Sequence, residues 1–162
     1  MKAVCCSAAL SGDGIATVVA ALIAAAAVVA TIVWDRRRQR ETRRAEAFAV
    51  ALQAVSDYLE APYLIRRRTR SDRGALTQSI SDIQSRLAFH QAHLALIDAS
   101  VSSAFDSLVR EAKREAGAQM KEAWESKPLR RDKQMSIAIA FPQPGSAKAR
   151  EQVVEAMRRS LR

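Results

Sequence analysis

The chain has 162 residues, a formal net charge of +9 and a sequence pI of about 10.4. Its aromatic content of 5% is low for a β-sandwich and ordinary for alanine-rich helices, and five glycines and four prolines indicate long elements with few turns. Both cysteines, Cys5 and Cys6, lie near the start of the chain, which excludes thiolate zinc sites and thiol catalysis from the rest.

The first predicted element is the uncharged stretch IATVVAALIAAAAVVATIVW, residues 15–34. As a helix it would cover about 30 Å, the thickness of a bilayer's hydrocarbon core. A cleaved signal peptide has a shorter apolar core of about 7–15 residues, and a buried core helix would need a larger soluble domain than the chain leaves. The stretch therefore predicts a single transmembrane helix, although its alanine content makes insertion favourable by only a small margin.

A basic block follows directly, and we call its arginines the first basic cluster: Arg36, Arg37, Arg38, Arg40, Arg43 and Arg44. Six arginines against Asp35 and Glu41 leave a net charge of +4, whereas Lys2 is the only basic side chain before the span. The positive-inside rule then predicts the C-terminal part in the cytoplasm and the N-terminal tail outside. Anionic lipid headgroups would attract these arginines at about 1 kcal/mol each.

The helix is predicted to continue into residues 35–60, with a 4-3-4 apolar stripe that begins at Phe48 and reaches Leu59. Pro62 is predicted to end or kink it, because the residue before a proline disfavours the α region. A second basic cluster follows: Arg66, Arg67, Arg68, Arg70 and Arg73. Three interpretations of it stay open, namely a solvated turn, a contact for an acidic partner and a nucleic-acid contact. Turn and cap residues at 71–74 place a chain reversal there.

The strongest periodic signal is a 4-3-4-3 apolar stripe from Leu76 to Leu108, which predicts a long helix of coiled-coil type. The segment DASVSS, residues 98–103, is rich in capping residues, and this favours a break with a new helix from Ser102 to Trp124. An amphipathic face continues through this second helix until Pro128 stops it.

Beyond a basic linker, residues 137–141 alternate large and small side chains, which predicts an isolated strand. A lone strand needs a partner, so we expect an extended arm that lies on the helices or pairs with a second chain. Ser146 is then expected to cap a last helix with an apolar side formed by Val153, Met157 and Leu161.

Residues that could perform chemistry are few. His90 and His93 lie one helical turn apart, but no HExxH or ExxH spacing surrounds them, and His90 falls on the apolar stripe. We therefore interpret His90 as a core histidine whose polar atoms are satisfied by hydrogen bonds. The sequence contains no glycine-rich phosphate loop and no GxSxG, so we expect no catalytic, cofactor-binding or metal-binding residues and no enzyme activity.

The alanine- and arginine-rich composition and the stretch REAGAQMKEAW, residues 114–124, resemble uncharacterised single-pass membrane proteins of high-GC bacteria. The resemblance covers the last third of the chain. Because no activity is attached to that group, it implies no function and no site residues.

The sequence thus predicts an all-α protein: a short extracytoplasmic tail (1–14), a transmembrane helix (15–34), a cytoplasmic helical bundle or coiled coil (35–126) and a basic linker, extended arm and C-terminal helix (127–162). The expected function is a non-catalytic scaffold or adaptor at the cytoplasmic face of the cytoplasmic membrane. A protein partner is expected, and we lean towards a homodimer. The alternatives are a membrane-tethered nucleic-acid-binding protein and an enzyme of unrecognised type.

Overall fold

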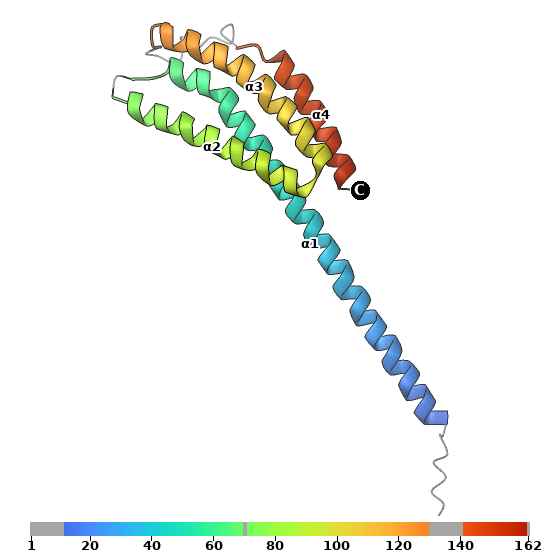
Figure 1. Ribbon diagram of the computed structural model, residues 1–162. Coiled ribbons are helices and arrows are strands. Elements are labelled where there is room, and N and C mark those ends of the chain that lie inside the picture. Colours follow the sequence, from blue (N-terminus) through green and yellow to red (C-terminus); the bar gives the residue numbers. More distant parts are fainter. Residues whose placement is uncertain (1–11, 70, 130–140, 162) are drawn as a thin grey trace, which may run out of the picture. The chain divides into compact units, whose positions relative to one another are not determined.

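The structure is a computed structural model that describes residues 12–69, 71–129 and 141–161; in residues 12–18 and at residue 20 only the helical backbone is described. Within these residues the regular structure consists of four helices without a strand, which confirms the predicted all-α class (Figure 1). The helices are α1 (Gly12–Arg66), α2 (Arg73–Ile97), α3 (Ala99–Glu125) and α4 (Pro144–Ser160).

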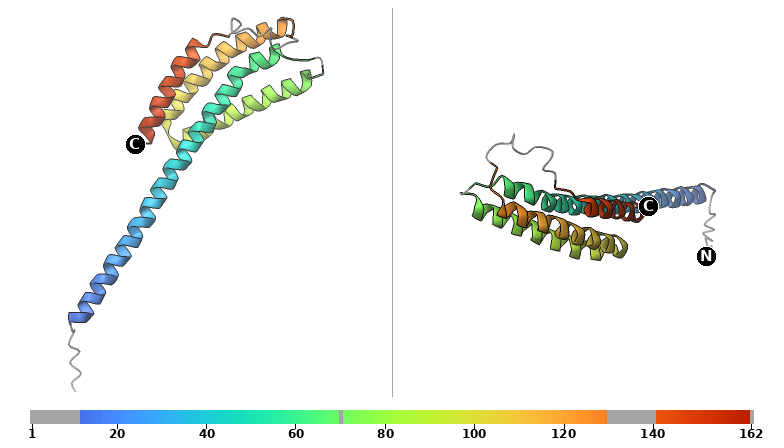
Figure 2. Two further views of the ribbon diagram at one scale, coloured as in Figure 1. Left: turned by 180° about the vertical axis from the view of Figure 1, so that it is seen from behind. Right: turned by 90° about the horizontal axis from the view of Figure 1, so that it is seen from above.

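The described residues divide into two compact units that part between Thr42 and Arg43. The first unit contains the N-terminal portion of α1. The second contains the rest of α1 together with α2, α3 and α4, and in it successive helices run in opposite directions (Figure 1 and Figure 2). The second unit is therefore an antiparallel four-helix bundle, which agrees with the bundle rather than the coiled coil among the two predicted forms.

All four helices contribute side chains to the core of the bundle. The two predicted stripes, which begin at Phe48 and at Leu76, supply half of the eighteen buried residues that the structure describes in it, because residues three and four positions apart share one helix face. At the start of α2, Leu76 and Ile80 are only half-buried. The buried core cluster comprises Phe48, Ala51, Ala54, Val55, Tyr58, Leu59, Ile83, Leu87, Leu94, Val101, Phe105, Leu108, Val109, Ala112, Ala116, Ala149, Val153 and Met157.

The predicted break in the long stripe is confirmed, but a single residue makes it, and α3 begins at Ala99 rather than at the predicted Ser102. Asp98 has extended backbone angles (φ −160°, ψ 117°) between the end of α2 and the start of α3. Its Oδ1 accepts hydrogen bonds from the backbone N–H groups of Ser100 (2.8 Å) and Val101 (3.1 Å). This side chain supplies acceptors for amides that a helix leaves unpaired at its start, so the stripe folds into two antiparallel helices.

Of the two outcomes predicted at Pro62, an end or a kink, the end does not occur, since α1 passes through Pro62 and ends at Arg66. A proline inside a helix removes one backbone hydrogen bond and crowds the preceding turn, at a cost of about 3 kcal/mol. Pro62 is fully buried in the bundle, as are Ala61 and Ile65 beside it. Burial of these apolar side chains offsets the cost, which the local sequence does not reveal.

The prediction that Ser146 caps the last helix is wrong. α4 begins at Pro144, with Gln143 at the N-cap position and no side-chain cap from that residue. Proline is well suited to the first helical position because its φ angle already matches a helix and it has no amide to leave unpaired. Ser146 instead lies inside the first turn, where it is buried and contacts α3.

The predicted strand falls largely outside the described residues, which resume at Phe141. The Phe141 ring lies edge-on to the Tyr63 ring, with centroids 4.9 Å apart. Its backbone N–H donates a hydrogen bond to the Tyr63 hydroxyl over 2.9 Å. The chain that leads into α4 is therefore attached to the C-terminal part of α1.

Candidate functional site

In the first unit, α1 leaves large apolar side chains uncovered. Leu22 is 65% exposed, Ile23 66% and Trp34 70%, and Val28, Val29, Ile32 and Val33 are exposed as well. A continuous apolar surface of this kind normally marks a contact with lipid or with another protein. Among the residues that the structure describes, no helix provides a segment long and apolar enough to cross a membrane.

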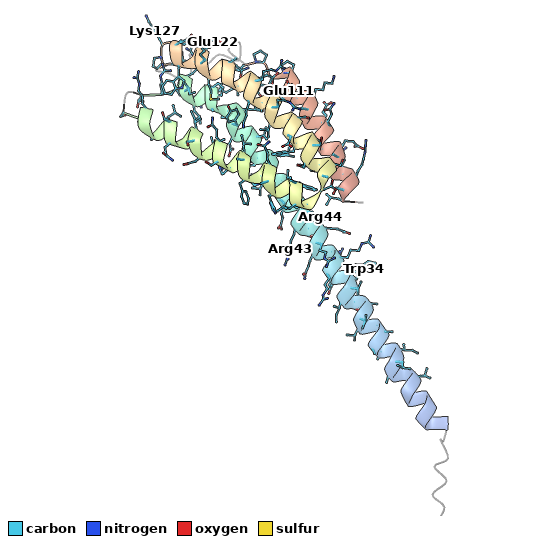
Figure 3. All side chains as sticks on the ribbon, in the orientation of Figure 1. Trp34, Arg43, Arg44, Glu111, Glu122 and Lys127 are labelled. Atoms are coloured by element: carbon cyan, nitrogen blue, oxygen red, sulfur yellow. The ribbon has the colours of Figure 1, made fainter. Side chains whose placement is uncertain are left out.

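The first basic cluster is exposed along its whole length. Four of its arginines belong to the first unit, whereas Arg43 and Arg44 belong to the bundle. Those two lie at the end of the bundle where α1 enters it, opposite the end that carries Glu122 and Lys127 (Figure 3). Arg37 Nε approaches Glu41 Oε1 at 3.4 Å, an exposed pair that contributes little to stability.

The second basic cluster does not form one surface. Arg67 and Arg73 are exposed, and Arg66 is half-buried and donates from Nη1 to the Lys127 carbonyl over 3.3 Å. Arg68 is buried, with 7% of its surface exposed. Arg70 lies outside the described residues. Arg68 therefore fits none of the three interpretations left open for the cluster, since each of them requires an exposed side chain.

Arg68 instead binds the C-terminal end of α3. Its Nη1 donates to the carbonyl of Ala123 (2.8 Å) and its Nη2 to those of Trp124 (2.9 Å) and Ser126 (2.9 Å). Nη1 also donates to the carbonyl of Ile65 at the end of α1, over 2.9 Å. The last carbonyls of a helix lack intrahelical donors and carry partial negative charge, so one buried guanidinium satisfies both helix ends.

The Trp124 ring completes this site, with the Arg68 guanidinium carbon 4.9 Å from the ring centroid. Burial, and then the charges of Arg73 and Arg66, lower the pKa of Arg68 from its ordinary value. Arginine nonetheless stays protonated in proteins because its ordinary pKa is so high. Sequence reasoning missed this role because nothing in the arginine run separates Arg68 from its neighbours.

A carboxylate of α3 holds the N-terminus of α4. The two carboxylate oxygens of Glu115 accept hydrogen bonds from the Gly145 amide (2.8 Å), the Ser146 amide (3.0 Å) and the Ser146 hydroxyl (2.6 Å). Burial acts to raise the pKa of Glu115, but these hydrogen bonds, with the charge of Arg114, hold it below its usual value. The cap that α4 lacks in its own sequence is thus supplied by α3.

Asp98 fastens the other end of α4. Its Oδ2 accepts a hydrogen bond from the Ser160 hydroxyl over 2.6 Å, while Oδ1 caps α3. The Ser160 hydrogen bond, followed by the Val101 and Ser100 amides and the charge of Arg44, lowers the pKa of Asp98. Glu115 of α3 therefore binds the N-terminal end of α4, and Asp98, the N-cap residue of α3, binds its C-terminal end.

These two carboxylates predict loss of stability in acid. Both have a lowered pKa when folded, so their stabilisation is complete above the ordinary values of 4.5 and 3.8 and is lost as the pH falls through the lower folded values. Urea titrations between pH 7 and about pH 2 should show the free energy of unfolding falling in that window. A variant with Glu115→Gln and Asp98→Asn should have a lower free energy of unfolding at pH 7 and a weaker dependence on pH. If the free energies of variant and parent fell in parallel with pH, these two carboxylates would not be the source of the acid sensitivity.

The two histidines gather no further metal ligands from the described part of the chain. His90 is buried on the α2 stripe as predicted, but the expected hydrogen bonds are incomplete, because its Nδ1 has no partner in the described part of the chain. Burial, followed by the charges of His93 and Arg86, lowers the pKa of His90 and favours the neutral ring. Across residues 12–69, 71–129 and 141–161, no three His, Cys, Asp or Glu side chains gather into a metal-binding group.

Comparison with known proteins adds no relative. No family model matches the chain, and neither a curated protein nor a solved structure is significantly similar to it.

Proposed function

We propose that the chain is a single-pass membrane protein whose bundle, residues 43–162, is a non-catalytic scaffold or adaptor at the cytoplasmic face. The observation that carries the proposal is the exposed apolar surface of α1, which includes Leu22, Ile23 and Trp34. It belongs to a stretch, residues 15–34, that has no charged residue in the sequence. Insertion into lipid would remove that surface from water without any protein partner.

The charge distribution supports the orientation. The first basic cluster begins two residues after the uncharged stretch, and arginines beside a span favour the cytoplasmic side. Trp34 at the boundary would place its amphipathic ring at the level of the headgroups. The bundle would then lie in the cytoplasm, with the short N-terminal tail outside.

The form of the bundle supports a role in binding rather than catalysis. Apolar side chains of all four helices fill its interior, and the buried Arg68 and half-buried Glu115 hold helix ends together. What such a bundle offers to other molecules is the outer faces of its helices. We therefore assign its activity to helix–helix contacts.

Anchoring is tested by washing membranes that contain the full chain with alkaline carbonate, which removes peripheral proteins. We expect the full chain to stay in the pellet and a variant lacking residues 15–34 to be released. Release of the full chain would contradict insertion. In a gel-shift assay at near-physiological salt, retardation of DNA or RNA by the full chain in detergent would contradict the scaffold and favour nucleic-acid binding.

Orientation makes a separate prediction. Replacement of the six arginines of the first basic cluster with glutamine should leave insertion intact and randomise orientation, because the difference in flanking charge disappears. A compartment-specific reporter fused at the C-terminus measures the fraction in each orientation. The matched control replaces the same six residues with lysine and should keep the original orientation. An unchanged orientation in the glutamine variant would show that another feature sets the topology.

A further inference from the structure

The outward face of α2 carries an apolar surface that the bundle does not use. Leu96 is 87% exposed and Phe89 62%, and Ala88, Ala92 and Ala95 are exposed around them. At 3.6 residues per turn these five lie on the side of α2 opposite its buried residues, which include Leu87 and Leu94. We call them the α2 outer patch.

The α2 outer patch is free of charge. From Leu87 to Ile97 the sequence contains no Asp, Glu, Lys or Arg, although such residues make up 27% of the chain. His90 is buried on the core side and His93 is half-buried, and the Phe89 ring packs against both, with centroid distances of 5.3 and 5.6 Å. A helix that only covers a core normally carries polar and charged residues on the face turned away from that core.

A shallow groove runs beside the patch, between the end of α2 and α3. Five of its seven residues are alanine or serine, so the groove is open to a side chain from outside. Its lining is Ala95, Ala99, Ser102, Ser103, Asp106, Ser107 and Arg110. Ala95 belongs to both the patch and the groove, so a protruding leucine and a recess of small side chains lie side by side.

We propose that the α2 outer patch and this groove form an interface with a second copy of the chain, related to the first by a two-fold axis. A two-fold interface pairs one surface with itself, so a protrusion must lie next to the recess that receives its counterpart. Leu96 beside Ala95 and Ala99 meets this requirement. The axis then passes close to Ala95.

The charge of the patch favours contact with a second copy of the chain over contact with an anionic lipid surface. Two chains that each carry +9 repel one another over most of their surface, and an uncharged patch lets them approach with the least repulsion. The groove adds one acid and one base, Asp106 and Arg110, so the patch and groove together carry no net charge. An anionic membrane would favour several basic side chains, and this interface offers one beside an acid. The interface does not depend on anchoring, although confinement to a membrane would raise the effective concentration of the two copies.

Cysteine crosslinking of the full chain in native membranes tests the interface. In a background with Cys5→Ser and Cys6→Ser, Ala95→Cys is oxidised with copper phenanthroline and analysed by gel electrophoresis without reductant. We expect a disulfide-linked species of twice the chain's mass. The control is Ala118→Cys, an exposed alanine of α3 outside the patch and groove, which should stay monomeric.

A second variant shows whether the patch drives the contact. Leu96→Asp, added to Ala95→Cys, should lower the crosslinked fraction about tenfold or more, because an interface would have to desolvate the new carboxylate. Its circular dichroism should match the parent, since Leu96 is exposed. Equal crosslinking at positions 95 and 118, no crosslinking, or an adduct with a protein of another mass would each overturn the proposal. The carbonate wash measures membrane insertion without reference to this interface, so a failure of insertion can be distinguished from a failure of the interface.

Discussion

Replacement of Arg68 with alanine is expected to lower the free energy of unfolding by about 3 kcal/mol. The guanidinium donates to four backbone carbonyls at the ends of α1 and α3, and the variant would leave them without these donors in a largely buried site. It would also remove the cation from the face of Trp124. Urea denaturation of the full chain in mild detergent, followed by circular dichroism, measures the loss.

Two matched variants make this test specific. Arg67→Ala removes an exposed neighbour of equal charge and should change the free energy of unfolding by about 0.5 kcal/mol or less. Arg68→Lys should restore only part of the loss, because an ammonium group cannot span carbonyls that a planar guanidinium reaches together. If Arg68→Ala were no worse than Arg67→Ala, the site would not hold the helix ends.

The second large effect is expected at Leu87, where aspartate would place a carboxylate in the centre of the core. Leu87 is 0% exposed and lies among apolar side chains of α1 and α3. Burial of an unpaired carboxylate, added to the lost packing, should cost about 4 kcal/mol or more against a total stability of about 5–15 kcal/mol. Circular dichroism should show reduced helix in the bundle and earlier unfolding in urea.

Leu96→Asp is the natural control, because it makes the same change on the same helix at a side chain that is 87% exposed. It should unfold close to the parent. If Leu87→Asp were as helical and as stable as Leu96→Asp, Leu87 would not belong to the core and the assignment of the two faces of α2 would be wrong.

The sequence by itself determined the helices and much of the core. Their signals are local: a stripe that repeats every three or four residues, such as Phe48 to Leu59, requires only that neighbours on one helix share a face. The cap at Asp98 is equally local, since its carboxylate binds amides two and three residues ahead. These features were predictable because the interacting groups are close in the chain.

The second apolar face of α2 was harder to foresee. Phe89 and Leu96 are as apolar as Leu87 and Leu94, and the sequence does not say which pair the bundle buries when both fit a helical period. The predicted stripe contained Leu87 and Leu94, which are buried. It did not indicate whether Phe89 and Leu96 would be covered by another part of the fold or stay exposed. Packing against α1 and α3 decided this, because only one side of α2 faces them.

Only the tertiary structure decided how the helix ends are held and how the basic residues divide. Arg68 reaches carbonyls of residues 123–126, and Glu115 reaches the amides of Gly145 and Ser146, contacts between groups far apart in the chain. Pro62 stays inside α1 because the bundle buries it. Each outcome depends on which side chains the fold brings together. The burial and hydrogen-bond energies that decide it come from residues far apart in the chain, so the neighbouring sequence does not contain them.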